Sequence, residues 1–193
     1  MVPIALFLSG TGGNALNLLR ACREGRVPAE PVLCLSSSTK APGNERLSAE
    51  GVPVQVQVRK DFPSDEAHSE ACFAAVEASG AEVVCLCGWL KHLVIPPRWE
   101  GRILNIHPAL LPNHGGAGMY GMQVHRAVVA AGEQESGCTI HLVDNVYDHG
   151  RILAQAKVPV LFGDTPEDLQ KRVYEQEMRL YPEALAAFLK RRG

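Results

Sequence analysis

Short apolar runs alternate with helical patterns along the first hundred residues, and this alternation restricts the fold more than any other feature of the sequence. Runs of this length without polar interruption are typical of strands buried on both faces, as in parallel sheets. Strands joined by helices predict an α/β fold with right-handed crossovers. The expected strands are PIALFL (3–8), PVLCLSS (31–37), VPVQVQV (52–58) and AEVVCLCG (81–88), and the expected helices cover 15–25, 43–50 and 64–79.

The second half of the chain continues the same pattern. RILNIHP (102–108) alternates like a buried strand, and Pro108 ends it because proline has no backbone donor. A long amphipathic helical region begins after Thr165, a favourable N-cap, and Pro182 is expected to break or kink it. The other expected elements are a helix at 122–131 and two strands within 136–160. Together they predict a Rossmann-like, mostly parallel twisted sheet with helices on both faces.

The length and composition fit one domain. With 193 residues, of which 46% are hydrophobic and 21% charged, the chain can bury a sizeable core. The net charge of -2 gives no electrostatic reason to expect a nucleic-acid partner. No 18-residue apolar span and no basic segment before the first apolar run are present, so neither a membrane nor a secretory route is expected.

The cysteines and histidines predict a protein of a reducing compartment that binds no metal. The six cysteines include no CxxC pair, so we expect free, mostly buried thiols and a cytoplasmic location. The seven histidines form no HExxH motif and no Cys/His spacing typical of zinc sites.

A glycine-rich turn, SGTGGN (9–14), follows the first expected strand and leads into a helix. Glycines let the backbone approach a ligand closely, and the free amides at a helix N-terminus favour an anion such as phosphate. The turn lacks the lysine of a Walker A loop and the GxGxxG dinucleotide pattern. It is compatible both with a phosphate cradle and with a plain tight turn in which Asn14 is the N-cap.

Asn105, His107 and Asp148 are the candidates for catalysis. Residues two apart in a strand point the same way, so Asn105 and His107 should lie side by side at a strand end, where α/β sheets have a crevice. Asp148, in the turn YDHGR (147–151), is expected to reach the imidazole. Taken singly, each residue also has an ordinary explanation as a hydrogen-bonded core group or a turn residue.

These three side chains together suit attack on a carbonyl-like carbon. An asparagine N–H and an imidazole can donate to the oxygen as it gains negative charge. His107 can also carry a proton from the attacking group to the leaving group, because imidazole titrates near neutrality. Asp148 is expected to orient the ring and to favour its charged form. No serine or cysteine nucleophile is required.

The segments around this expected site have more than one interpretation. GWLKHL (88–93) can clasp a flat heterocycle or simply cover the end of the sheet. The glycine-rich segment 113–121 is expected to be a mobile loop beside the site. His114 and His125 are candidates for substrate contacts, whereas His141 alternates with apolar neighbours and is expected to be a paired sheet residue.

Six motifs in order resemble those of the folate-dependent formyltransferases, and the likeness covers nearly the whole chain. The resemblance is closest to the members that act on glycinamide ribonucleotide in purine synthesis. SGTGGN resembles the family's phosphate loop SGxGSN, and NIHPALLP (105–112) resembles its NIHPSLLP. The other matches are CGWLKHL (87–93), GGAGMYGMQVH (115–125), YDHGRILAQ (147–155) and RVYEQEMRLYP (172–182).

The resemblance implies transfer of the formyl group of 10-formyltetrahydrofolate to the glycine amine of glycinamide ribonucleotide, in de novo purine (IMP) biosynthesis. It implies one domain over 1–193, with a phosphate-binding half (1–100) and a catalytic and folate-contacting half (101–193). It also implies small-molecule substrates, no metal, and a monomer or homodimer. The implied site residues are Asn105, His107 and Asp148 for catalysis, Gly12, Gly13, Asn14 and Glu177 for the ribonucleotide phosphate and ribose, and Leu90, Lys91, His92, Leu93 and Asn105 for the folate.

Three positions depart from the family pattern. Gly13 replaces the loop serine, so that one hydroxyl contact to phosphate is missing. Lys91 stands where arginine is frequent, and Asp65 stands near where another arginine can face the folate tail. Attraction for the folate carboxylates is then weaker, or it comes from Arg59 or Lys60.

Two other functions fit parts of the sequence. A hydrolase that releases formate from 10-formyltetrahydrofolate shares the catalytic trio, but its family adds an N-terminal domain, and other folate-dependent formyltransferases add C-terminal ones. Neither addition is expected here, because the chain begins at its first strand and ends after its last helix. A nucleotide-binding module without catalysis would explain the glycine turn but not the polar trio.

Overall fold

Seven strands form one sheet in the order β3-β2-β1-β4-β5-β6-β7 in the computed structural model, which describes residues 1–191. Strands β1 to β5 are parallel, whereas β6 runs antiparallel to β5 and β7 runs antiparallel to β6. The predicted fold class is therefore confirmed. The strands are β1 (Val2–Leu8), β2 (Ala29–Ser36), β3 (Val54–Val56), β4 (Val83–Leu86), β5 (Ile103–His107), β6 (Glu135–Leu142) and β7 (Ile152–Pro159). The helices are α1 (Gly13–Arg23), α2 (Pro42–Ala49), α3 (Asp65–Ala78), α4 (Met122–Ala130) and α5 (Pro166–Lys190).

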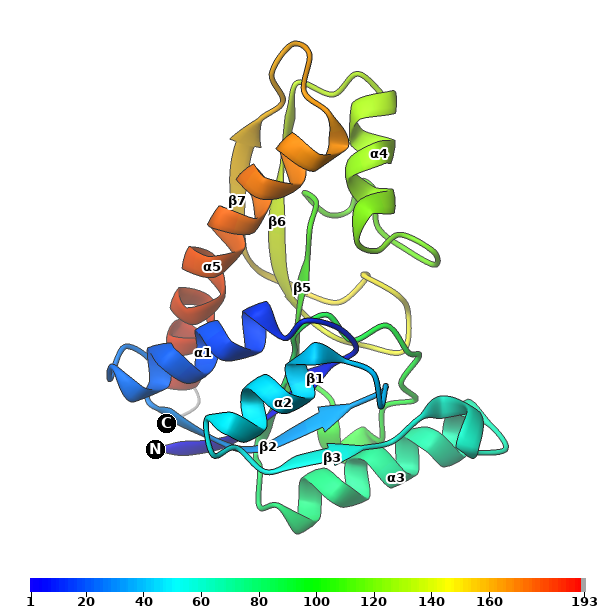
Figure 1. Ribbon diagram of the computed structural model, residues 1–193, viewed down its shortest axis with the longest axis vertical. Coiled ribbons are helices and arrows are strands. Elements are labelled where there is room, and N and C mark those ends of the chain that lie inside the picture. The colour runs from blue at the N-terminus through cyan, green and yellow to red at the C-terminus, as the bar shows by residue number, and fades with distance from the viewer. Residues whose placement is uncertain (192–193) are drawn as a thin grey trace.

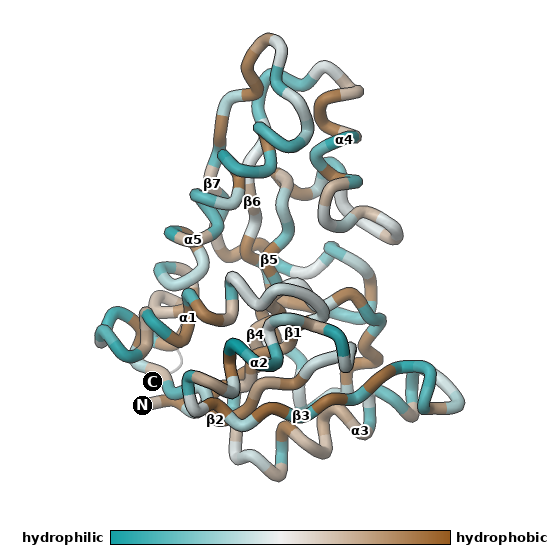
Figure 2. The backbone as a smooth tube through the Cα atoms, viewed as in Figure 1, coloured by the Kyte–Doolittle hydropathy of each residue, from teal (hydrophilic) through white to brown (hydrophobic). Residues whose placement is uncertain are grey.

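Hydrophobic side chains cover both faces of this sheet. In β1, Ile4, Leu6 and Leu8 belong to the core cluster that contains α1, α2 and α5. Ala5 and Phe7 belong to the cluster on the other face, which contains α3. The alternation follows from the two-residue period of a strand, and the helices on both sides explain why the whole strand is apolar. Figure 2 shows hydrophobic residues along the strands and hydrophilic ones along the outer turns.

A break or a kink was expected at Pro182, and helix α5 continues through this residue without a break. Proline has no N–H to offer the carbonyl four residues earlier, which belongs to Met178. The side-chain amide of Asn17, on α1, donates to that carbonyl at 2.7 Å, so the carbonyl keeps a hydrogen bond. The neighbouring Tyr181 is fully buried and its hydroxyl lies 3.1 and 3.2 Å from carbonyl oxygens of β4 and β5. These contacts fix α5 against α1 and the sheet.

Two local expectations are corrected. Strand β3 has three residues rather than seven, because Pro53 lacks a donor and the amide of Val52 bonds instead to the carbonyl of Leu47 at the end of α2. Asn14 is not the N-cap of α1, because Gly12 occupies that position with a left-handed φ of 73°. Asn14 lies inside the first turn, and its side chain is free to contact another helix.

The two ends of the sheet form two parts of the molecule (Figure 1). Strands β1 to β3 and helices α1 to α3 form the lower part, whereas β6, β7, α4 and the first half of α5 form the upper part. Within residues 1–191, no helix is long and apolar enough to cross a membrane. All six cysteines are free and buried, as expected, and burial raises the pKa of the Cys34 thiol to about 12.

Candidate active site

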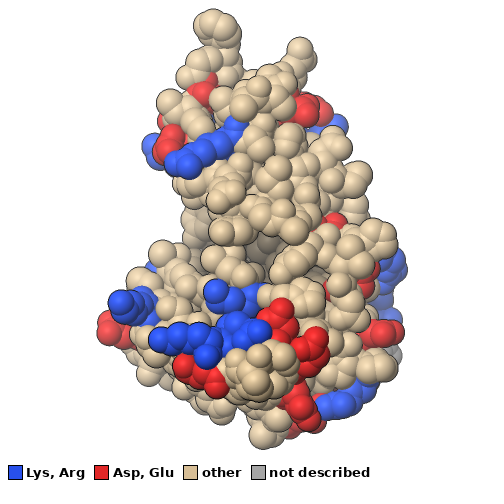
Figure 3. All heavy atoms as spheres, turned by 90° about the vertical axis from the view of Figure 1, so that its right-hand side faces the viewer, with Lys and Arg blue, Asp and Glu red and all other residues tan. Residues whose placement is uncertain are grey.

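A cavity of about 410 Å³ opens at the carboxyl ends of β1, β4 and β5. Strand β1 lies between β2 and β4, because the chain first adds β2 and β3 on one side of β1 and then returns to add β4 on the other side. Open α/β sheets bind ligands at such a switch in strand order. Figure 3 shows the recess between the lower and upper parts of the molecule. The lining comes from the segments 10–14, 86–92, 105–108, 116–121 and 143–148 and from α4, β6 and α5.

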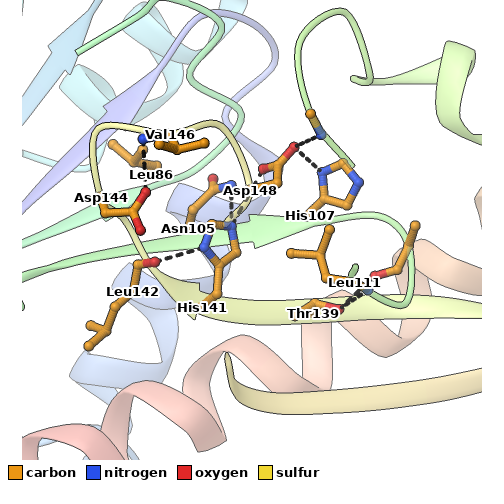
Figure 4. Close-up of polar contacts among 12 residues, drawn as sticks. Leu86, Asn105, His107, Leu111, Thr139, His141, Leu142, Asp144, Val146 and Asp148 are labelled. Carbon is orange, nitrogen blue, oxygen red and sulfur yellow. Dashed lines mark hydrogen bonds and ion pairs between the residues drawn. The ribbon is translucent and has the colours of Figure 1, made fainter. Parts of the chain in front are cut away.

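His107 and Asp148 meet in this cavity, as the sequence predicted. His107 Nδ1 and Asp148 Oδ2 are 3.4 Å apart, and both side chains are largely buried. Nε2 of His107 lies 2.8 Å from the carbonyl oxygen of His114. Both ring nitrogens therefore face acceptors. Figure 4 shows the carboxylate of Asp148 between His107 and His141. An imidazolium formed during proton transfer would have partners for both of its N–H groups.

Asn105 is held by His141, which the sequence analysis had assigned only to sheet pairing. The two residues are register partners across β5 and β6, and Asn105 Nδ2 lies 3.0 Å from His141 Nε2. His141 Nδ1 lies 2.8 Å from the carbonyl oxygen of Leu142, so we assign the proton to Nδ1 and let Nε2 accept from the amide. The second N–H of Asn105 then remains for the cavity. Only the antiparallel pairing of β6 reveals this contact, and no local sequence pattern shows that pairing.

The backbone around Asp148 is shaped by its neighbours. His114 and Asp148 both have left-handed conformations, with φ of 53° and 54°, which side chains with a Cβ disfavour. The amide of Gly116 donates to Oδ2 of Asp148 at 3.0 Å and so joins the two loops. At Gly150, a Cβ would lie 1.9 Å from the carbonyl oxygen of Leu142, so the turn requires glycine there. Contacts between loops, rather than local preference, therefore position the carboxylate.

Burial and hydrogen bonding decide which of the two side chains, His107 or Asp148, is charged. Burial lowers the pKa of His107, although the Asp148 carboxylate acts in the opposite direction. Burial raises the pKa of Asp148, but the contact with His141, the proximity of His107 and the Gly116 amide bring it below its ordinary value. At neutral pH, Asp148 is therefore ionised and His107 is neutral. Asp148 favours the charged imidazole, as expected, but burial has the larger effect on the pKa of His107.

The glycine loop forms the other end of the cavity. Gly12 precedes α1, whose first amides have no side-chain cap, and Arg46 of α2 donates to the carbonyl of Thr11 at 2.8 Å. Asn14 donates to Oε2 of Glu177 at 2.9 Å. Burial raises the pKa of Glu177 to about 7, although the Asn14 contact acts in the opposite direction. This end therefore combines helix amides with a carboxylate that changes charge near neutral pH.

The loop 88–93 is divided between the cavity and the core. Leu90, Lys91 and His92 line the cavity. Leu93 is buried in the core cluster that contains α3 and lies outside the lining. It is the one residue of those implied by the resemblance that the structure does not bring to the cavity.

The two further histidines differ in their relation to the cavity. His125 of α4 is buried and lines it, and burial lowers its pKa to about 4. The ring of His114 points to Glu133, with 3.3 Å between Nε2 and Oε1, and its carbonyl oxygen contacts His107. Within residues 1–191, no group of three or more His, Cys, Asp or Glu side chains could hold a metal ion.

Asp65, one of the three departures from the family pattern, has basic groups beside its carboxylate. Arg59 forms an ion pair with Asp65, and His92 Nδ1 lies 3.8 Å from the other carboxylate oxygen. Neither Arg59 nor Asp65 lines the cavity. Arg59 is therefore occupied in neutralising Asp65, which leaves Lys91 as a basic side chain on the cavity wall.

Comparison with known proteins assigns the family. Residues 2–185 match the family described as formyl transferase. The chain belongs to that family. A chloroplastic phosphoribosylglycinamide formyltransferase of Arabidopsis thaliana is 41% identical over 98% of this chain, which spans 66% of the plant protein. The phosphoribosylglycinamide formyltransferase of Haemophilus influenzae is 34% identical over 94% of this chain and 84% of its own length. A trifunctional purine biosynthetic protein of Drosophila pseudoobscura pseudoobscura is 39% identical, and this chain spans 13% of it.

Solved structures share the fold of this chain. Glycinamide ribonucleotide transformylase 1 of Symbiobacterium toebii superimposes with a TM-score of 0.92 at 38% identity, covering 100% of this chain and 89% of that one. Phosphoribosylglycinamide formyltransferase of Brucella melitensis gives 0.86 at 43% identity, covering 97% and 95%. The resemblance read from the six motifs is therefore confirmed.

Proposed function

We propose that this chain is a phosphoribosylglycinamide formyltransferase, which transfers the formyl group of 10-formyltetrahydrofolate to the glycine amine of glycinamide ribonucleotide. The main support is that Asn105, His107 and Asp148 converge on one cavity that also contains a glycine loop at a helix N-terminus. The bacterial relatives of similar length carry this activity in their names. The step belongs to purine synthesis, as the names of the trifunctional relatives also suggest.

The two substrates occupy opposite ends of the cavity in this proposal. The ribonucleotide phosphate binds at the N-terminus of α1, where Gly12, Gly13 and Asn14 offer backbone amides and a side-chain amide. Glu177, in its ionised form, accepts from the ribose hydroxyls. The folate binds along residues 90–92, and its carboxylates are attracted to the lysine of that segment.

The catalytic group acts as the amine attacks the formyl carbon. The free N–H of Asn105 donates to the formyl oxygen as it gains charge, and His141 holds the amide in that orientation. His107, neutral at rest, takes the proton of the amine and returns it to the folate nitrogen, while Asp148 stabilises the intervening imidazolium. Nε2 of the imidazole lies 2.8 Å from the carbonyl oxygen of His114, so the loop that carries His114 has to move away before Nε2 can take a proton from the substrate.

The expected setting is that of a cytoplasmic enzyme with small-molecule substrates. A reducing compartment keeps the six cysteines free. The proposal is compatible with a monomer or a homodimer, since one chain supplies both ends of the cavity.

A substrate-omission assay tests the proposed function. Purified protein is mixed with 10-formyltetrahydrofolate, with and without glycinamide ribonucleotide, and the release of tetrahydrofolate is followed together with the formylated product. Release that requires the ribonucleotide is the expected result. Release without it would indicate a hydrolase, and no release in either mixture would indicate a binding module.

A further inference from the structure

The side chain of Tyr174, on α5, lies against the glycine loop. A Cβ added to Gly13 would lie 2.2 Å from the hydroxyl oxygen of Tyr174 and 3.2 Å from Cζ of its ring. Atoms that are not bonded do not approach to 2.2 Å, so a side chain at position 13 and this hydroxyl exclude one another. Tyr174 therefore fills the space into which a side chain of the loop would project.

This hydroxyl lies at the part of the cavity that is suited to an anion. Gly13 is the first residue of α1, an 11-residue helix, and its N-cap residue makes no side-chain hydrogen bond to the first amides. Tyr174 and Glu177 are three residues apart on α5 and so lie on the same face of the helix. Glu177 contacts Asn14, one residue after Gly13, so two neighbouring side chains of α5 reach two neighbouring positions of the loop.

The hydroxyl is available as a donor. Within residues 1–191, Tyr174 Oη has no hydrogen-bond partner, and the side chain is partly exposed on the cavity wall. Burial and the proximity of Glu177 raise the pKa of Tyr174, while Arg46 acts in the opposite direction. The phenol therefore remains protonated at neutral pH, and a protonated hydroxyl beside helix amides donates to an anion.

We propose that Tyr174 donates a hydrogen bond to the phosphate of the ribonucleotide and replaces the hydroxyl that the loop lacks at position 13. This inference rests on the proposed function and adds a phosphate-binding side chain to it. Gly13 and Tyr174 then form one unit, because the glycine leaves the space in which the hydroxyl lies. A purely steric cover for the loop would need the ring of Tyr174 but not its hydroxyl.

The test is a double-mutant cycle on the full chain with four proteins: wild type, Tyr174→Phe, Gly13→Ala and the double variant. Tyr174→Phe removes only the hydroxyl and is expected to raise the KM for glycinamide ribonucleotide about tenfold, the loss typical of one hydrogen bond to a charged group at a partly exposed site. The turnover at saturation and the KM for the folate should change less than twofold. Gly13→Ala displaces the hydroxyl and should have a similar effect.

Coupling decides between the hydroxyl and a steric role. In the double variant the KM should equal that of either single variant, because the same contact is lost only once. Gly13→Ser in the Tyr174→Phe background should recover most of the affinity, since serine supplies a hydroxyl in the vacated space. The matched control is Gly10→Ala, where a Cβ meets nothing within 4 Å, and its effect should be the same in both Tyr174 backgrounds. Additive losses, or an unchanged KM in Tyr174→Phe, would overturn the inference.

Calorimetry, which measures the binding of ribose 5-phosphate and of ribose, separates this inference from the proposed function. Weaker binding of ribose 5-phosphate to Tyr174→Phe, in a protein that transfers no formyl group, would leave the inference standing and remove the function. Normal formyl transfer, with the same ribose 5-phosphate affinity in Tyr174→Phe and wild type, would remove the inference and leave the proposed function standing.

Discussion

The two ends of the cavity contain two buried carboxylates whose pKa values are shifted in opposite directions. Glu177, at the glycine-loop end, has one donor, the side-chain amide of Asn14, and burial raises its pKa to about 7. At the other end of the cavity, burial also raises the pKa of Asp148. The contacts with His141, His107 and a backbone amide nevertheless bring this pKa below its ordinary value. The polar groups that face a buried carboxylate therefore decide its charge.

The difference also separates the tasks of the two ends. At the end that contains His107, the proposed proton transfer requires a negative charge beside the imidazole, and three segments of the chain converge to keep Asp148 ionised. The glycine-loop end binds through backbone amides and a few side chains of α5. Glu177 can therefore be neutral in the free protein and ionise only as pH rises or as donors arrive with a ligand.

Removing the imidazole of His107 is expected to have the largest effect, and to change turnover much more than the KM for glycinamide ribonucleotide. His107→Ala should lower turnover by on the order of 10² or more, because the group that carries the proton from the amine to the folate nitrogen is lost. The KM for glycinamide ribonucleotide should stay within a few-fold of wild type, since the glycine-loop end is intact. Steady-state kinetics on the folded variant measures both. His149→Ala is the matched control, because that histidine is exposed and outside the cavity lining. Wild-type turnover in His107→Ala would remove this division of roles.

Glu177→Gln tests the raised carboxylate through the stability of the protein. Between roughly pH 4.5 and 7 the folded state keeps a proton on Glu177 that the unfolded state has lost, so this group lowers the free energy of unfolding as pH rises through that range. Relative to wild type, the variant should gain about 2–3 kcal/mol between pH 5 and pH 8, measured by urea denaturation at both values.

Asp148→Asn is the opposite case and serves as the control for Glu177→Gln. Its lowered folded-state pKa adds stability above the unfolded-state pKa, and this is lost only as pH falls through the folded-state value. Asp148→Asn also removes the carboxylate that raises the pKa of His107, so this comparison is made in a His107→Ala background, where the effect of Asp148→Asn should be the same at pH 5 and pH 8. Equal pH responses of the two variants would contradict the assignment of opposite shifts.

The smallest expected effect concerns the support of α5, which carries Glu177 to the glycine loop. Asn17→Ala leaves the Met178 carbonyl without a partner and should lower the free energy of unfolding by about 1 kcal/mol. In a Pro182→Ala background the residue at 182 regains its N–H, so the same substitution at Asn17 should cost less. Urea denaturation of the four proteins measures the coupling. An equal cost in both backgrounds would show that the amide is not what compensates for the proline.

The sequence predicted those parts of the site that depend on neighbouring residues. The strand, glycine turn and helix of residues 3–23 are specified locally, and so is the side-by-side placement of Asn105 and His107. His141 was missed as a member of the site because its role depends on antiparallel pairing with a strand some 30 residues away. Side-chain direction in a loop is equally non-local, which is why Leu93 was expected in the cavity and lies in the core.

The continuity of α5 at Pro182 and the resting charge of His107 could not be predicted from isolated segments. Proline removes a donor, and a carboxylate favours an imidazolium. Asn17 restores a partner to the helix, and burial of His107 outweighs its carboxylate. Both outcomes depend on residues packed against the segment rather than on the segment itself.

The four-residue ladder between β5 and β6 also determines where this chain can change in length. Asn105 and His141 face one another only in the present register, and a one-residue insertion within either strand would turn every following side chain to the opposite face. Insertions and deletions between these two residues are therefore compatible with an intact site only in the connection 108–134, and homologues of different length can be aligned on the ladder itself.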